Sequence, residues 1–502
     1  MRLNELRVQI DAIDKSIVEL FSKRMEICKD VALCKKAEGK AVFDPEREKK
    51  KLAQIAELSS NQMRDYTESL YSLIMDLSKD YQEQILAEEA ESNMMGKCYG
   101  LLGEKLGHSF SPQIHSLLAN YEYRLYPVER DDLEMFLAMC PLDGLNVTIP
   151  YKKDVLPMCS YISEPVKRIG SANTLVKKDN GWHAYNTDYL GFKYMVESSG
   201  CKVTGEKVAV LGSGGASLAV QAALEDMGAG EIVVISRSGE NNYENLHINA
   251  DAAVIVNTTP VGMYPNVGES PVSLESFPKC KAVFDIVYNP ARTELIMQAE
   301  EKGLLCRSGL SMLVAQAHAA AELFTGRKIP ENKIEEIISV LENQTQNIVL
   351  IGMPGCGKSS VGRELGMISG RKFMDADEYL REKCGMSAAD MISEMGEHYF
   401  RQQEKLVLEE LGKQSGIIIA TGGGCVTVEE NYKHLHRNGK IFWRKRDIEK
   451  LCIQGRPLSQ QISMQEMYEK RAPLYERFAD FVIENDGDDP LLAAKMILEA
   501  MQ

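Results

Sequence analysis

Apolar side chains recur in the first part of the chain at gaps that alternate between three and four residues. The positions are Leu6, Ile10, Ile13, Ile17, Leu20, Ile27 and Val31. This spacing predicts one long helix with a single apolar stripe, roughly 40 Å from Leu6 to Cys34 at 1.5 Å per residue. We expect Gly39 and Pro45 to end it.

Two more helical stretches are predicted at about residues 46–58 and 62–88. Three helices form only a thin core, and a helix this long cannot bury its own apolar stripe. We therefore expect an all-α domain over residues 1–90 that pairs with a second copy of the chain.

The pattern changes after an acidic, polar stretch at residues 87–93. Short apolar runs now alternate with helical periods, as at residues 207–211, 231–236, 253–257 and 282–287. This alternation predicts an α/β domain over residues 96–340. A second polar joint at residues 341–346 precedes a fresh strand at 347–351, which opens another α/β domain over residues 346–502.

Composition narrows the choice of partners and compartment. The length of 502 residues suits about three domains. A formal net charge of −15 argues against non-specific nucleic-acid binding. No apolar run approaches the ~20 residues that cross a membrane, and the start lacks the apolar core of a signal peptide. The 12 cysteines show no paired framework, so we expect reduced thiols and a cytoplasmic protein.

A glycine-rich loop at residues 352–359 has the complete spacing of a triphosphate-binding loop. It follows a predicted strand and precedes a helical stretch, the context in which backbone N–H groups bind phosphate. Lys358 can reach the transferred phosphate, and the Ser359 hydroxyl can ligate Mg²⁺.

Polar residues downstream of this loop indicate the phosphoryl acceptor. Two carboxylates, Asp375 and Asp377, end a short apolar run, and residues 421–424 include three glycines that let the backbone approach a ligand closely. Arg401 and Arg471 are separated cations that suit a carboxylate. With the segments 455–458 and 471–475, these residues resemble shikimate kinase across residues 347–502.

That resemblance assigns roles to individual residues. It implies that Asp377, Arg401, Gly423 and Arg471 bind shikimate, with Asp377 orienting or deprotonating the attacking hydroxyl. Ser359 and Asp375 would hold Mg²⁺. The implied ATP-binding residues are Gly355, Cys356, Gly357, Lys358, Ser359, Ser360 and Arg456.

A second glycine-rich loop at residues 212–217 has a dinucleotide pattern. Gly212 and Gly214 meet it, although Ser217 replaces the third small residue. The next predicted strand ends in Ser236, Arg237 and Ser238, where an NAD enzyme carries an acidic residue. Arg237 suits a 2′-phosphate, so NADP is favoured.

Polar residues before this loop could bind a polyhydroxylated ring through neutral hydrogen bonds. They are concentrated at residues 107–112, 146–152, 172–174 and 186–188. A Lys paired with an Asp can pass a proton to and from a carbinol oxygen during hydride transfer. With further matches at residues 257–263, 285–288 and 309–316, the segment resembles shikimate dehydrogenase over residues 97 to about 335.

The resemblance implies a substrate half at about residues 96–195 plus C-terminal helices, and a Rossmann half at about 196–310. Lys152 and Asp188 would be the catalytic pair. The implied contacts of 3-dehydroshikimate are Ser109, Ser111, Thr148, Lys152, Asn173, Asp188, Tyr288 and Gln316. The implied NADP contacts are Gly212, Ser213, Gly214, Gly215, Ala216, Ser236, Arg237, Ser238 and Gly309. Use of quinate and NAD is an alternative for this domain.

One cation interrupts the apolar stripe of the first segment. Arg24 falls four residues after Leu20 and three before Ile27, where a charge must snorkel, pair or meet an anion. Together with Arg7, Lys35, residues 44–48, Ser78 and Gln82, it resembles the all-helical chorismate mutase, over residues 1 to about 88.

Chorismate is a dicarboxylate whose rearrangement needs no proton transfer, so a compact conformer and nearby cations are what accelerate it. By resemblance Arg7, Arg24, Lys35 and Arg47 supply positive charge, and Arg24 and Lys35 are the catalytic cations. Asp44, Glu48, Ser78 and Gln82 would complete the site. The resemblance also implies a helical dimer in which the partner contributes an Arg, for which Arg7 is the candidate.

The sequence thus predicts a multidomain, trifunctional enzyme of the shikimate pathway. It would use NADP(H), ATP and Mg²⁺ on chorismate, 3-dehydroshikimate and shikimate. The alternative is a bifunctional dehydrogenase–kinase whose helical domain only dimerises or binds a regulatory effector.

Overall fold

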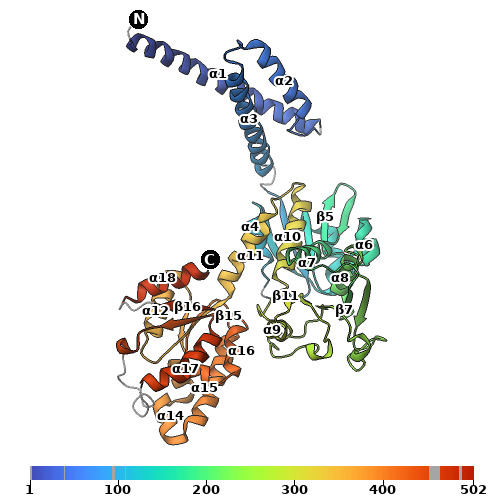
Figure 1. Ribbon diagram of the computed structural model, residues 1–502. Helices are drawn as coiled ribbons and strands as arrows, with labels where there is room; N and C mark the ends of the chain where they lie inside the picture. Colours follow the sequence, from blue (N-terminus) through green and yellow to red (C-terminus); the bar gives the residue numbers. More distant parts are fainter. Residues whose placement is uncertain are drawn as a thin grey trace. The chain divides into compact units, whose positions relative to one another are not determined.

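The computed structural model describes residues 3–38, 40–92, 96–107, 109–451, 464–484 and 489–501 (Figure 1). The chain divides into two compact units. One, the helical unit, comprises Met1–Lys97 with Asn120–Glu122; the other, the α/β unit, comprises Cys98–Ala119 and Tyr123–Gln502.

The predicted helices of the helical unit are confirmed. They are α1 (Leu3–Ala37), α2 (Pro45–Leu58) and α3 (Arg64–Ser92), and α3 packs against both of the others. One detail of the prediction is wrong: Pro45 does not end the first helix but begins α2. Proline suits that first position because no helical partner is needed for its missing N–H. Asp44 caps α2 by accepting from the Arg47 backbone N–H at 3.1 Å.

The core of the helical unit is small, as expected for three helices. Ala32, Ile55, Ala56 and Met75 are buried. By contrast, the apolar stripe of α1 lies mostly in solvent. Exposed fractions run from 41% to 66% for Leu6, Ile10, Ile13, Ile17, Leu20 and Ile27.

The first sheet of the α/β unit has six strands in the order β2-β1-β3-β5-β6-β4. The strands are β1 (Cys98–Gly103), β2 (Glu122–Pro127), β3 (Gly144–Val147), β4 (Cys159–Ile162), β5 (Thr174–Lys178) and β6 (Gly181–Tyr185). β1 and β3 are parallel, whereas β5 runs antiparallel to both of its neighbours. Helices α4 (Ser111–Leu118), α5 (Leu133–Met139) and α6 (Glu164–Ile169) belong to this half.

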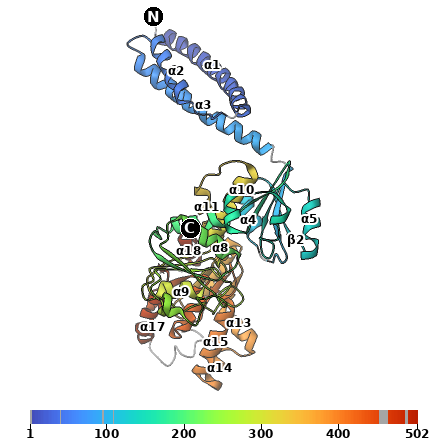
Figure 2. The same ribbon diagram turned by 90° about the vertical axis from the view of Figure 1, so that its right-hand side faces the viewer.

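The second sheet is parallel, with the order β11-β10-β9-β7-β8. Its strands are β7 (Lys207–Leu211), β8 (Glu231–Ile235), β9 (Val254–Asn257), β10 (Ala282–Asp285) and β11 (Leu305–Ser308), with helices α8 (Gly215–Asp226) and α9 (Glu294–Glu301). Two helices, α7 (Asp188–Ser198) and α10 (Leu310–Thr325), pack closely together because Gly191 has no side chain. A Cβ at that position would lie 2.6 Å from the Met312 carbonyl oxygen. Figure 2 shows α4, α10 and α11 together on the first half, in agreement with their contacts.

Helix α11 (Asn332–Thr345) leads directly into the third sheet, whose parallel strands have the order β13-β14-β12-β15-β16. The strands are β12 (Asn347–Ile351), β13 (Phe373–Asp375), β14 (Ile418–Ala420), β15 (Gly439–Lys445) and β16 (Phe481–Glu484). Helices α12 (Lys358–Ser369) and α18 (Pro490–Met501) pack together beside this sheet (Figure 1). The remaining helices are α13 (Ala376–Cys384), α14 (Ala388–Met395), α15 (Glu397–Gly412), α16 (Glu430–His436) and α17 (Met464–Phe478).

The order of this sheet brings the carboxyl ends of β12, β13 and β14 to one edge, which is where ligands bind in parallel α/β folds.

No helix within the described ranges is long and apolar enough to cross a membrane.

Candidate active sites

The loop between β12 and α12 has the backbone geometry that its glycines allow. Gly352, Gly355 and Gly357 have φ values of 144°, 85° and 94°, which side chains rarely adopt. A Cβ at Gly352 would also lie 2.6 Å from the Arg444 carbonyl oxygen. Lys358 donates its ammonium group to the carbonyl oxygens of Gly352 and Met353, at 2.8 and 3.1 Å, so the charge lies inside the loop.

A hydroxyl and a carboxylate lie together beside this loop. Ser359 Oγ donates to Asp375 Oδ2 at 2.6 Å. The other oxygen of Asp375 caps α13 by accepting from the backbone N–H groups of Asp377 and Glu378. Oxygen ligands of this kind suit Mg²⁺.

The glycines after β14 let polar side chains approach the backbone. A Cβ at Gly422 would lie 2.9 Å from Asp377 Oδ1, and one at Gly424 would overlap the Arg401 guanidinium at 2.1 Å. Arg471 donates to the Gly423 carbonyl oxygen at 3.1 Å. The predicted acceptor residues therefore meet around one short glycine segment.

A buried carboxylate, Glu404, holds Arg401 and was not predicted as a site residue. Its Oε2 accepts from Arg401 at 2.7 Å, and its exposed fraction is 2%. Burial raises the pKa of Glu404, while the Arg401 cation opposes that shift. The i,i+3 spacing of the two residues on α15 is the sequence signal that could have found it.

These residues line one cavity of about 660 Å³. Its walls include Gly355, Gly357, Lys358, Ser359, Ser360, Asp375, Asp377, Arg401, Glu404, Gly423, Arg446 and Arg471. Cys356 differs, because its side chain is fully buried in the core, where its Sγ lies 3.9 Å from Lys358 Nζ. The predicted ATP contact Arg456 lies outside the described residues.

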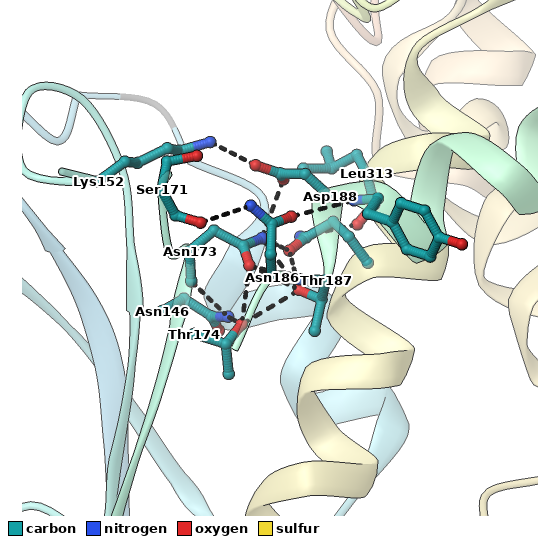
Figure 3. Close-up of polar contacts among 11 residues, drawn as sticks. Asn146, Lys152, Ser171, Asn173, Thr174, Asn186, Thr187, Asp188 and Leu313 are labelled. Atoms are coloured by element: carbon teal, nitrogen blue, oxygen red, sulfur yellow. Dashed lines mark hydrogen bonds and ion pairs between the residues drawn. The ribbon is translucent and has the colours of Figure 1, made fainter. Parts of the chain in front are cut away.

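In the first half of the α/β unit, Lys152 and Asp188 form an ion pair. Lys152 Nζ lies 2.6 Å from Asp188 Oδ2, and both side chains are largely shielded from solvent (Figure 3). Asp188 is the first residue of α7, where the positive end of the helix dipole favours a carboxylate. Asn173 donates to its other oxygen at 2.9 Å.

An amide and hydroxyl network fixes this pair in place. Asn173 Oδ1 accepts from the Thr187 backbone N–H at 2.6 Å, and Asn173 Nδ2 also lies 3.3 Å from Gln316 Oε1. Asn146 donates to Thr174 Oγ1 at 3.1 Å (Figure 3). The supporting roles of Asn146, Thr174 and Thr187 were not predicted, because nothing in the sequence says which hydroxyls are buried together.

The remaining predicted substrate contacts lie on three segments. Ser109 Oγ accepts from the backbone N–H of Ser111 at 3.2 Å. Phe110, between them, packs against Tyr288 with ring centroids 5.8 Å apart. Thr148, which follows β3, is half-buried and donates its backbone N–H to Leu102. Burial raises the pKa of Tyr288.

The β7–α8 turn has the geometry of a dinucleotide loop. Gly212 has a φ of 102°, and a Cβ there would lie 2.9 Å from both Thr258 Oγ1 and Thr259 Cγ2. The turn continues through Ser213, and Gly214 caps α8, whose first residues are Gly215 and Ala216.

The other predicted cofactor residues follow the ends of β8 and β11. Ser236 is buried just after β8, whereas Arg237 and Ser238 are exposed. Gly309 follows β11, where a Cβ would overlap the Ile286 carbonyl oxygen at 2.0 Å. The exposed guanidinium after β8 and the tight first turn fit NADP.

Asp285, at the end of β10, is a buried group for which the sequence predicts no role of its own. Desolvation raises its pKa to about 6. It accepts from Asn257 at 2.9 Å and from Thr293 at 2.6 Å, and so orders the segment that carries Tyr288.

In the helical unit, several predicted residues meet where α1 and α3 pack. Arg24 donates to Ser78 Oγ, and Gln82 donates to the Ser78 carbonyl oxygen at 3.0 Å. Lys79, also on α3, lies 3.3 Å from Glu48 of α2. Lys35 donates to the Val42 carbonyl oxygen at 2.5 Å. Arg7 and Arg47 are exposed.

Arg7 is far from Arg24 of its own chain. It precedes Arg24 by 17 positions on the continuous helix α1, which is about 25 Å at 1.5 Å per residue.

Family models match three consecutive parts of the chain. "Chorismate mutase type II" matches residues 6–83, "Shikimate dehydrogenase substrate binding domain" matches residues 101–175, and "Shikimate kinase" matches residues 354–502.

Curated relatives match the middle of the chain. A shikimate dehydrogenase (NADP(+)) of Clostridium perfringens is 38% identical over 268 residues, which cover 49% of this chain and 98% of the relative. One from Caldicellulosiruptor bescii is 38% identical over 245 residues, covering 43% and 85%.

A solved structure, a chorismate mutase/shikimate 5-dehydrogenase fusion protein from Clostridium acetobutylicum, is 39% identical. It covers 49% of this chain and 97% of its own, with a TM-score of 0.47. From the relatives and the family models together, the chain belongs to the shikimate dehydrogenase family, and it carries a chorismate mutase domain before that enzyme and a shikimate kinase domain after it.

Proposed function

We propose that this trifunctional enzyme rearranges chorismate to prephenate, reduces 3-dehydroshikimate to shikimate with NADPH, and phosphorylates shikimate with MgATP. The observation that carries the proposal is that each domain contains its own set of converging site residues. For the dehydrogenase this set is the shielded Lys152–Asp188 pair, and for the kinase it is the 660 Å³ cavity between Lys358 and Arg471.

In the dehydrogenase, Lys152 is the group that exchanges a proton with the carbonyl oxygen as it becomes a hydroxyl. Asp188 keeps the ammonium group in position, and Asn173 keeps Asp188 in position through its second oxygen. NADPH, when bound, supplies the hydride. Gly212 and Gly214 support its pyrophosphate at the α8 N-terminus, and Arg237 pairs with its 2′-phosphate.

NADP is favoured over NAD by Arg237. An exposed guanidinium at the end of β8 can pair with the 2′-phosphate of NADP, whereas NAD enzymes carry a carboxylate there that accepts from the ribose hydroxyl. Arg237→Asp is therefore expected to shift the preference toward NAD.

In the kinase, Arg401 and Arg471 bind the shikimate carboxylate while Asp377 orients the attacking hydroxyl. ATP, when bound with Mg²⁺, supplies the phosphoryl group. Lys358 and the backbone of residues 355–360 hold its phosphates, and Ser359 and Asp375 hold the metal. Glu404 stops Arg401 from turning away because it binds the guanidinium from the buried side.

In the mutase, Arg24 and Lys35 provide the charge that stabilises the ether oxygen as negative charge develops. Ser78 and Gln82, next to Arg24, bind polar groups of chorismate, with Asp44, Arg47 and Glu48 from the start of α2. The resemblance adds one more cation to this set, Arg7, from the partner chain.

A second copy of the chain supplies that cation. Arg7 lies too far along α1 to join the Arg24 site of its own chain, while the exposed apolar stripe of α1 is a large surface that a second helical unit would cover. We therefore infer a homodimer through the helical unit, in which Arg7 acts in the partner's site.

The test is to assay the three reactions separately on one purified chain. Lys152→Ala should remove at least 99% of dehydroshikimate reduction and leave prephenate formation and shikimate phosphorylation unchanged, roughly the loss of one proton-transfer group. Wild-type protein that reduces and phosphorylates but forms no prephenate would instead support the alternative, a helical unit that only dimerises or binds an effector.

A further inference from the structure

A turn of the kinase domain contacts the dehydrogenase segment that carries Tyr288. The turn, residues 436–439, joins α16 to β15; the segment, residues 288–293, follows β10, and we call it the Tyr288 loop. The backbone N–H of Arg292 donates to the Arg437 carbonyl oxygen at 2.9 Å. The backbone N–H of Ala291 donates to Asn438 Oδ1 at 3.3 Å.

The Arg292 side chain continues this contact. Its Nη1 donates to the carbonyl oxygens of His436 and Gly439, at 2.9 and 3.4 Å, while its Nε donates to Glu300 at 3.1 Å. The kinase turn therefore binds both the backbone and the side chain of one loop residue.

Ion pairs between α9 and α16 surround these bonds. Glu294 accepts from Lys433 and from Arg437, both at 2.9 Å, and His436 Nε2 lies 3.3 Å from Glu300. Arg437 and His436 are buried. These ion pairs favour one arrangement of α9 against α16, because separating a buried pair leaves a charge without a partner.

On its own side, the dehydrogenase holds the Tyr288 loop near both ends. Thr293 donates to Asp285 at 2.6 Å, and the Asn289 carbonyl oxygen accepts from the Tyr264 backbone N–H at 3.1 Å. Between these points, the described backbone bonds at residues 291 and 292 come from the kinase turn, while the Arg292 side chain also bonds Glu300 of α9.

A cavity of about 550 Å³ adjoins the loop. Its walls include Tyr288, Asn289, Arg292, Ser415 and Asn438. The kinase turn therefore fixes the backbone of the loop at residues 291 and 292.

The position of this loop matters to the dehydrogenase because Tyr288 packs on Phe110, which lies between Ser109 and Ser111. We propose that Arg292 and Asn438 are positioning residues for dehydroshikimate binding, so that the kinase domain completes the dehydrogenase site by holding Tyr288 against Phe110. This rests on the proposed role of Tyr288 as a substrate contact. A small displacement of such a contact weakens substrate binding even though no reacting group is altered.

The experiment uses the full chain and a double-mutant cycle. Arg292→Ala and Asn438→Ala should each raise the KM for dehydroshikimate about fivefold, roughly the worth of one hydrogen bond, with kcat nearly unchanged. Tyr288→Phe should raise the same KM, and adding either alanine substitution to it should then have little further effect. Asn438→Asp keeps an acceptor for the Ala291 N–H but loses the donor to the Gln414 carbonyl oxygen, so it should restore part of the loss in KM.

A matched control is Lys433→Met, which breaks ion pairs to Glu294 and Glu301 but touches no residue of the Tyr288 loop. It should lower the melting temperature without changing the KM for dehydroshikimate. Shikimate phosphorylation, measured on every variant, should stay at the wild-type rate and so exclude an unfolded kinase domain.

The outcomes separate this inference from the proposed function. If Tyr288→Phe raises the KM and the two alanine variants do not, the positioning role is wrong while the Tyr288 contact stands. The positioning role is equally wrong if the alanine variants raise the KM by the same factor with and without the Tyr288 hydroxyl. An unchanged KM in Tyr288→Phe would overturn the assignment of Tyr288 itself.

Discussion

The kinase domain and the helical unit assemble their sites in opposite ways. In the kinase, residues from position 355 to position 471 line one cavity within one chain. In the helical unit, Arg7 and Arg24 lie on the same helix but about 25 Å apart. Parallel strands end at one edge and bring distant residues together, whereas a long helix spreads its residues along an axis. For the second arrangement we propose that another copy of the chain completes the site.

The largest expected effect concerns the self-contained site. Lys358→Ala should lower shikimate phosphorylation on the order of a thousandfold, because it removes the cation nearest the transferred phosphate. Product formation from shikimate and MgATP measures the loss. Dehydroshikimate reduction and prephenate formation are the internal controls, and a parallel collapse of either would contradict independent sites.

Mixing two inactive chains tests the shared site. Arg7→Ala and Arg24→Ala should each abolish prephenate formation, but dimers that exchange chains should recover about a quarter of the wild-type activity. Half of the dimers are then mixed, and one of their two sites has both arginines. No recovery after verified exchange would mean that Arg7 and Arg24 serve the same chain's site.

The apolar stripe of α1 can be disrupted by a single charge. Ile17→Asp should convert dimers to monomers in light scattering and lower prephenate formation at least tenfold, because a carboxylate is costly on a stripe that the partner would bury. The matched control is Lys15→Asp, since Lys15 is exposed on α1 but outside the stripe. Dimers that persist with Ile17→Asp would place the contact elsewhere.

The smallest expected effect is a pH dependence at the junction of kinase and dehydrogenase. Burial lowers the pKa of His436, but hydrogen bonds to Asp480 and Glu300 outweigh burial and raise the pKa above 6.5. The Arg292 cation opposes this rise, and Tyr432 stacks on the imidazole ring. The stabilising contribution is therefore complete below pH 6.5 and is lost as pH rises through the folded pKa.

Thermal unfolding measured between pH 5.5 and 8.5 tests this sign. His436→Gln should flatten the melting-temperature profile by a few degrees, mainly by lowering its acidic end. If the melting temperature of the wild type falls toward acidic pH and that of His436→Gln does not, the predicted sign is wrong.

The features that the sequence determined by itself are those encoded in consecutive or periodic residues. The loop around Lys358, the α1 stripe and the dinucleotide turn at Gly212 depend on local spacing, and the structure forms them where the spacing predicts. Arg24 was detectable for the same reason, because a charge breaks an otherwise apolar period.

Only the tertiary structure decided which distant groups are buried together. Asp285 against Thr293 and Asn438 against the Tyr288 loop join segments whose sequences show no sign of each other. Burial is what gives these groups their effect, since a polar group removed from water must find a partner. Which partner it finds depends on how the strands and helices pack, and residue spacing alone does not contain that information.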